Sequence, residues 1–168
     1  MTAGRNVLLD FFFIGATWLG SLWVLVPSAV AMCGVLIFRG RRMEALLLAG
    51  SLAGAAILSP VVKRVFVRAR PEALHRLIPM PQDASFPSTH TAQITAISLA
   101  AILIACRLTA PEACVFVWIV GVMLILLVGI SRVYLEVHYP SDVAGGAILS
   151  VLWVFGLYRL MTGLGILD

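Results

Sequence analysis

Charged residues are scarce in this 168-residue sequence. Lysine and arginine together number 12 and aspartate and glutamate 8, so only 12% of the residues are charged, about half of the roughly 25% typical of soluble domains. Hydrophobic residues make up 61% of the chain, and the mean hydropathy is +1.05. This composition excludes an ordinary soluble domain and indicates an integral membrane protein.

Cysteine is also rare. Cys33, Cys106 and Cys114 are odd in number, lie in or next to apolar runs and form no C-x-x-C motif, so we interpret them as small core residues. Histidine, aspartate and glutamate are not grouped at the spacing of metal ligands. We therefore expect neither a metal nor any other cofactor.

The net charge of +4 does not indicate a nucleic-acid partner. The basic residues lie at the ends of apolar segments and in polar clusters, and they form no separate basic arm, so anionic lipid is the simpler partner. The first apolar stretch has little charge before it and is longer than the apolar part of a cleavable signal peptide. We expect this stretch to belong to the mature protein.

The apolar segments predict an all-α membrane bundle. A span needs about 20 apolar residues, so the chain has room for about five spans and forms a single domain, residues 1–168. We predict that residues 7–16 form an N-terminal interfacial segment. The predicted spans cover residues 17–38, 43–62, 88–106, 111–130 and 142–161.

A proline-rich segment lies between the second and third spans. Its four prolines exclude a continuous helix over residues 67–87, although Leu74, Leu77 and Ile78 are spaced for a short apolar-faced turn. We predict a loop here that serves as a lid or as an entrance for lipid.

Three polar clusters interrupt the apolar sequence, at residues 63–71, 86–90 and 131–142. Threading five spans through a membrane places all three clusters on the same side. Charges at membrane depth are costly, so their presence there indicates function. The clusters together predict one phosphate-handling site.

The first cluster offers two cations. Lys63 and Arg70 are seven residues apart, close to two helical turns, and would share one face if the helix continues past Lys63. They would then clamp one anion. The alternative is a pair of side chains that snorkel at a membrane surface.

The second cluster begins a helix. Ser88 follows Pro87 and starts an apolar run, which is typical of an N-cap. The free backbone NH groups of Thr89 and His90 would then point, with the helix dipole, at a bound anion. The alternative role for Ser88 is capping alone, which leaves His90 unexplained.

The third cluster combines a histidine with a carboxylate. His138 and Asp142 are four residues apart with Pro140 between them, so a turn would let Asp142 accept a hydrogen bond from one imidazole nitrogen. The other nitrogen would be presented as a base or nucleophile. Arg132, just upstream, would add a third cation.

These clusters resemble the three motifs of the type 2 phosphatidate phosphatase family, K-x6-RP, PSGH and SR-x5-H-x3-D. The wider superfamily also includes vanadium haloperoxidases and class A acid phosphatases. The motifs span residues 63–142 in the family's order and spacing, and the one departure is Thr89 in place of glycine. This branched side chain would narrow the pocket and bear on substrate choice.

The resemblance implies metal-independent dephosphorylation in two steps. His138 would attack phosphorus while Asp142 orients it, and His90 would protonate the leaving oxygen. Water would then hydrolyse the phosphohistidine with His90 as base. The resemblance also implies phosphate-binding residues, namely Lys63, Arg70, Ser88, Thr89 and Arg132.

The leading hypothesis is a lipid phosphate or diphosphate phosphatase, acting on a substrate such as undecaprenyl diphosphate, phosphatidylglycerophosphate or phosphatidate. A non-catalytic lipid-phosphate binder or transporter is the main alternative, although it would not need a nucleophile and an acid. A vanadate-dependent haloperoxidase is disfavoured by the five spans.

Location and assembly follow partly from the resemblance. It implies a bacterial inner membrane with the site on the outer face, and a six-helix core from which this chain lacks the first helix. The N-terminal segment or a neighbouring protomer would then replace that helix. Small residues in the second span and Gly145–Gly146 permit close helix contacts within or between protomers. A homo-oligomer is therefore one of the alternatives.

Overall fold

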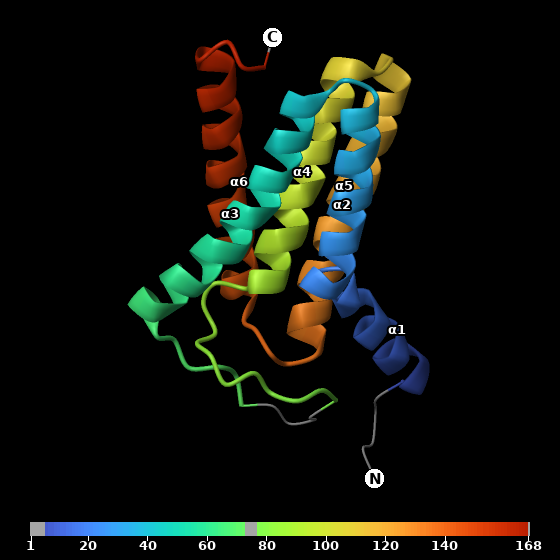
Figure 1. Ribbon diagram of the computed structural model, residues 1–168. Helices are drawn as coiled ribbons and strands as arrows, with labels where there is room; N and C mark the ends of the chain where they lie inside the picture. The colour runs from blue at the N-terminus through green and yellow to red at the C-terminus, as the bar shows by residue number, and fades with distance from the viewer. Residues whose placement is uncertain (1–5, 73–76, 168) are drawn as a thin grey trace.

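The computed structural model describes residues 6–72 and 77–167, and within them every regular element is a helix (Figure 1). The helices follow in the order α1 Val7–Trp18, α2 Leu22–Phe38, α3 Arg42–Phe66, α4 Thr89–Leu108, α5 Pro111–Tyr134 and α6 Pro140–Gly163.

The helix lengths agree with an integral membrane bundle. In the described part of the chain, α3, α4, α5 and α6 are each long and apolar enough to cross a bilayer, and α1 with α2 qualifies as one span bent by 48°. The predicted all-α membrane bundle is therefore confirmed, with four spans, or five if the bent pair is one span. The interfacial position of residues 7–16 stays a prediction.

The predicted position of the N-terminal break was wrong by a few residues. We placed it between residues 16 and 17, whereas α1 continues to Trp18 and α2 begins only at Leu22. The break contains Gly20, where an added Cβ would lie 2.7 Å from Val128 and 3.1 Å from His90. The chain bends where a residue without a side chain allows it to approach α4 and α5.

Helix α4 is the central element. It packs against α2, α3, α5 and α6, and its Ala92, Ala96 and Ala100 are fully buried. Small side chains of this kind allow close helix contact in a membrane. Helix α1 instead contacts α5, where the Phe13 and Tyr134 rings lie 4.2 Å apart.

The bundle brings the polar clusters to one end. Figure 1 shows the C-terminal ends of α3 and α5 at the same end as the N-terminal ends of α4 and α6. The α2–α3 and α4–α5 connections lie at the opposite end. The convergence expected from threading the spans is therefore present in the fold.

The connection between α3 and α4 is a loop, as the prolines predicted. Helix α3 ends at Phe66, and Val67 follows in the left-handed region with φ of 39°. The expectation that Lys63 and Arg70 share a helical face was wrong, because Arg70 belongs to the loop. Leu77 and Ile78 form no helical turn, and Leu74 lies outside the described residues.

The interpretation of the cysteines also needs correction. Cys106 and Cys114 form a disulfide, with their Cα atoms 4.8 Å apart, while Cys33 is a free, partly buried thiol. The connection from α4 to α5 is so short that the last turn of α4 and the first turn of α5 face each other. Spacing along the sequence alone did not reveal this pairing.

Candidate active site

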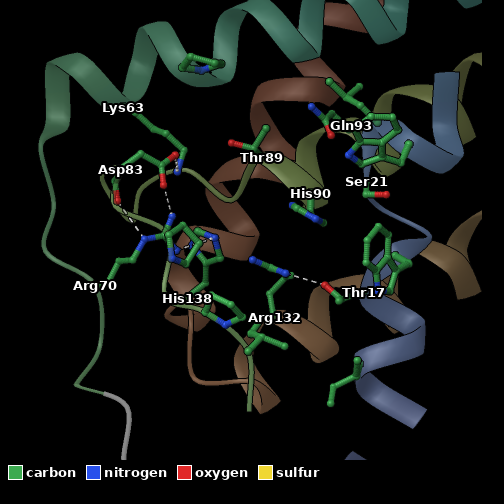
Figure 2. Close-up of a pocket in the computed structure, with 18 residues that line it drawn as sticks. Thr17, Ser21, Lys63, Arg70, Asp83, Thr89, His90, Gln93, Arg132 and His138 are labelled. Atoms are coloured by element: carbon green, nitrogen blue, oxygen red, sulfur yellow. Dashed lines mark hydrogen bonds and ion pairs between the residues drawn. The ribbon is translucent and has the colours of Figure 1, made fainter. Parts of the chain in front are cut away.

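A cavity of about 600 Å³ opens at the end of the bundle where the polar clusters meet. Figure 2 shows Lys63, Arg70, His90, Arg132 and His138 arranged around it. These side chains come from the three polar clusters of the sequence, which the fold brings together. The rest of the wall is largely apolar, and it is formed by Ile14, Trp18, Leu22, Trp23, Pro60, Ile78, Pro79 and Pro81.

Lys63 and Arg70 meet although they do not share a helix. The Lys63 side chain is 6% exposed and that of Arg70 is 8% exposed. The loop after α3 turns back, and Arg70 is fixed there because its Nη1 donates to the Val137 carbonyl at 2.7 Å. The two cations therefore line the cavity together, close enough to share one anion.

His138 is placed as a nucleophile would be. It is 3% exposed and lies between α5 and α6. Its Nδ1 is 3.4 Å from Oδ2 of Asp142, and its Nε2 is 3.3 Å from Nη1 of Arg70. With Nε2 accepting from Arg70, the proton of the neutral ring is on Nδ1, facing the carboxylate.

The electrostatic environment keeps His138 neutral. Burial, followed by the charges of Arg132, Arg70 and Lys63, lowers the pKa of His138 from 6.5 to about 3, although Asp142 acts in the opposite direction. A neutral imidazole keeps a lone pair at physiological pH, as nucleophilic attack requires. In this structure the lone pair on Nε2 faces Nη1 of Arg70.

Asp142 is held firmly behind His138. It is fully buried, and its Oδ2 accepts from the Tyr139 backbone NH at 2.9 Å and from the Ser85 hydroxyl. Its Oδ1 accepts from Nη1 of Arg68 at 2.8 Å. Arg68 itself lies over the Tyr139 ring, 4.2 Å from its centroid. A carboxylate with this many donors is held in one position next to His138.

The start of α4 contributes His90 and Thr89 to the cavity wall, whereas Ser88 lies behind it. Ser88 is fully buried, and its hydroxyl accepts from the Thr91 backbone NH at 3.4 Å and from the Thr91 hydroxyl at 2.9 Å. The predicted N-cap is therefore present. Its side chain is engaged within α4 rather than directed into the cavity.

Arg132 connects the third cluster with the N-terminal segment. It is 3% exposed, and its Nη1 donates to the Thr17 hydroxyl at 2.6 Å. Its Nε has no hydrogen-bond partner, although a buried donor normally requires one. Arg132 thus faces the cavity with donor capacity left for an anion.

Three residues at the site were missed by sequence reasoning, namely Arg68, Asp83 and Ser85. Asp83 contacts Lys63 and Arg70, and the other two hold Asp142. Arg68 lies between Lys63 and Arg70 in the sequence, which was the available signal. Asp83 and Ser85 lie in a loop without periodicity, so only the fold reveals their partners.

The fold and the site together define a membrane-embedded protein with a cationic pocket and a buried histidine whose Nδ1 lies 3.4 Å from a buried carboxylate. In residues 6–72 and 77–167, no three His, Cys, Asp or Glu side chains are grouped to hold a metal ion. The model of the PAP2 superfamily matches residues 44–165. The chain belongs to this superfamily, and it is an enzyme, a phosphatase of the hydrolase class.

Several curated relatives are similar over most of the chain. The undecaprenyl-diphosphatase BcrC of Bacillus subtilis (strain 168) is 28% identical over 92% of this chain and 76% of its own length. Phosphatidylglycerophosphatase B of the same organism is 30% identical over 90% of this chain and 74% of its own length.

Two solved structures share the fold. The transmembrane PAP2-type phosphatidylglycerolphosphate phosphatase from Bacillus subtilis has a TM-score of 0.83 and 29% identity, over 95% of this chain and 80% of that one. LpxE from Aquifex aeolicus has a TM-score of 0.70 and 25% identity, over 93% of this chain and 88% of that one.

Proposed function

We propose that the protein hydrolyses a phosphate or diphosphate group of a membrane lipid through a phosphohistidine at His138, without a metal ion. The observation that carries this proposal is the common cavity of Lys63, Arg70, His90, Arg132 and His138. Its position at the end of a membrane bundle suits a substrate whose head group lies at the bilayer surface.

In the first step, Nε2 of His138 attacks phosphorus, and the bond from phosphorus to the leaving oxygen breaks. The negative charge of the bound substrate favours the protonated form of His90, and this imidazolium supplies the proton that the leaving oxygen needs. Asp142 holds the imidazole and stabilises the positive charge that it gains, as the carboxylate does in other histidine-carboxylate pairs. The lipid product leaves with one phosphate fewer.

In the second step, water attacks the phosphohistidine. His90, now neutral, accepts a proton from that water, the P–N bond breaks, and inorganic phosphate forms. Through both steps the phosphoryl oxygens bind Lys63, Arg70, Arg132 and the Thr89 backbone NH. Each well-aimed donor contributes about 3–4 kcal/mol to transition-state stabilisation by comparison with oxyanion holes. Ser88 supports this arrangement through the cap of α4.

The apolar wall supports a lipid rather than a soluble phosphate ester as substrate. Trp18, Leu22 and Trp23 line the cavity from the α1–α2 bend, and Ile78 and Pro79 line it from the loop. A hydrocarbon chain next to the head group would contact these residues. The relatives are named for a polyprenyl diphosphate and a glycerolipid phosphate, so both classes are candidate substrates.

Phosphate release in detergent tests the proposal. The panel holds isoprenoid diphosphates, phosphatidylglycerophosphate and phosphatidate, with EDTA present throughout. We expect turnover in the wild type and in Arg64→Ala, an exposed cation at the end of α3, and loss of turnover in His138→Ala and His90→Ala. Folded protein without turnover on any lipid would favour a binding or transport role.

We also propose that the site faces the outside of a bacterial cytoplasmic membrane. The exposed Glu72 lies on the loop at this end, so Glu72→Cys in a Cys33→Ala background should react with a membrane-impermeant maleimide in whole cells. Failure to react would place the site inside. The Cys106–Cys114 disulfide at the opposite end would in that case face the oxidising compartment, where disulfides persist, whereas the proposed orientation places it in the cytoplasm.

A further inference from the structure

Asp83 lines the cavity and contacts two of its cations, Lys63 and Arg70, although no step of the proposed reaction uses it. Figure 2 shows its carboxylate between Lys63 and Arg70. Oδ2 lies 2.9 Å from Nζ of Lys63, and Oδ1 lies 2.5 Å from Nη2 of Arg70. Among the described residues that line the cavity, Asp83 is the one carboxylate.

Residues 83–84 accept most of the hydrogen bonds that Lys63 and Arg70 can donate into the cavity. Lys63 also donates to the Ala84 carbonyl, and Nε of Arg70 donates to the Asp83 carbonyl at 2.9 Å. A planar guanidinium binds a carboxylate or a phosphate with the same fork of donors. A substrate phosphate therefore needs the same NH groups that Asp83 now holds.

Asp83 and His138 contact the same guanidinium, that of Arg70. Nη2 of Arg70 donates to Asp83, while Nη1 of the same guanidinium lies 3.3 Å from Nε2 of His138. An anion that replaced Asp83 on this guanidinium would lie beside the nucleophilic nitrogen. The Asp83 side chain is 54% exposed, so it has open space into which it can withdraw.

We propose that Asp83 is the resident anion of the phosphate site, a carboxylate that substrate must displace and that competes with the inorganic phosphate product for Lys63 and Arg70. The proposal rests on the function proposed above and deepens it, because it identifies a residue that sets the affinity of the site. With Lys63, Arg70 and Arg132 around one cavity, free phosphate would otherwise bind tightly and be released slowly.

The ionisation state of Asp83 agrees with this role. Burial alone would raise the pKa of Asp83, but hydrogen bonds and charge from Lys63 and Arg70 hold it below its ordinary value. The residue therefore stays an anion under physiological conditions. A neutral asparagine of the same shape removes that charge and leaves the loop otherwise unchanged.

Direct binding of inorganic phosphate tests the proposal without requiring turnover. Isothermal titration calorimetry on the detergent-solubilised full chain would compare the wild type, Asp83→Asn and the control Glu72→Gln, which removes one charge from the same loop. Loss of a charge-assisted contact predicts about tenfold tighter phosphate binding in Asp83→Asn. Glu72→Gln should remain within about twofold of the wild type, as is usual for exposed charges.

Kinetics extend the test. With a lipid substrate, Asp83→Asn should show a lower KM and stronger inhibition by phosphate, and Asp83→Ser should behave alike if the asparagine variant is not stably folded. Weaker or unchanged phosphate binding in the folded variants would overturn the proposal, because Asp83 would then only position the cations. Tighter binding without lipid turnover in the wild type would support it and refute the proposed function alone.

Discussion

The ion pair between Arg68 and Asp142 permits a quantitative test of how His138 is oriented. Nη1 of Arg68 lies 2.8 Å from Oδ1 of Asp142, whose side chain is fully buried, whereas the Arg68 side chain is 39% exposed. A hydrogen bond to a charged group contributes about 1.5–3 kcal/mol. Solvent screening at Arg68 reduces this to about 1–2 kcal/mol.

If that free energy holds Asp142 in the geometry that His138 needs, Arg68→Ala lowers kcat about 5- to 30-fold. The assay is initial-rate phosphate release from the preferred lipid, with the thermal unfolding midpoint measured in the same detergent. The exposed Arg64, at the end of α3, provides a charge-matched control as Arg64→Ala. KM should change little, because Arg68 does not line the cavity.

A double-mutant cycle separates orientation from a general loss of structure. Arg68 acts through Asp142, so Arg68→Ala should have little further effect on kcat in an Asp142→Asn background. Equal effects of Arg68→Ala in both backgrounds would refute the reasoning. So would a folded Arg68→Ala variant whose kcat matches that of Arg64→Ala.

Three further predictions concern Gly20, His138 and Thr89. Gly20→Val should lower both thermal stability and turnover, because a Cβ there meets Val128 and His90, whereas Gly15→Val, with open space around it, should be near neutral in both assays. The pKa of His138 is lowered to about 3 in the folded protein. Below about pH 6.5 the unfolded chain therefore binds a proton at this residue that the folded protein does not bind. The thermal unfolding midpoint should fall as the pH drops through this range. This fall should be shallower in His138→Gln, and equal slopes would show that His138 is not kept neutral. Thr89→Gly removes a branched side chain from the wall, so turnover should persist while more head groups are accepted in the lipid panel; an unchanged range would mean that Thr89 does not limit the pocket.

The sequence was sufficient to predict that the three polar clusters meet, because membrane spans alternate in direction. Lys63 ends one span, Ser88 opens the next, and the same holds for Ser131 and Asp142. Once the spans were recognised, the three clusters had to meet at one end of the bundle. The spacing of His138 and Asp142 around Pro140 similarly predicted a turn that brings imidazole and carboxylate together.

Contacts made by loops and by the N-terminal segment could not be predicted in the same way. Arg70 reaches the cavity because the chain reverses after Val67, not because a helix continues. Asp83 has no periodic pattern that would connect it with Lys63, and the contact between Thr17 and Arg132 joins residues 115 positions apart. Such contacts depend on the packed bundle, which a local pattern does not specify.

Trapping the intermediate tests the central claim most directly. The wild type and His138→Ala would be mixed rapidly with ³²P-labelled lipid substrate in the presence of EDTA, quenched in alkali and digested for mass spectrometry, because phosphohistidine is stable in base and labile in acid. The account predicts a phosphorylated His138 that forms and decays at rates consistent with turnover, and none in His138→Ala. Rapid turnover by His138→Ala, or phosphate carried by a different residue, would contradict it.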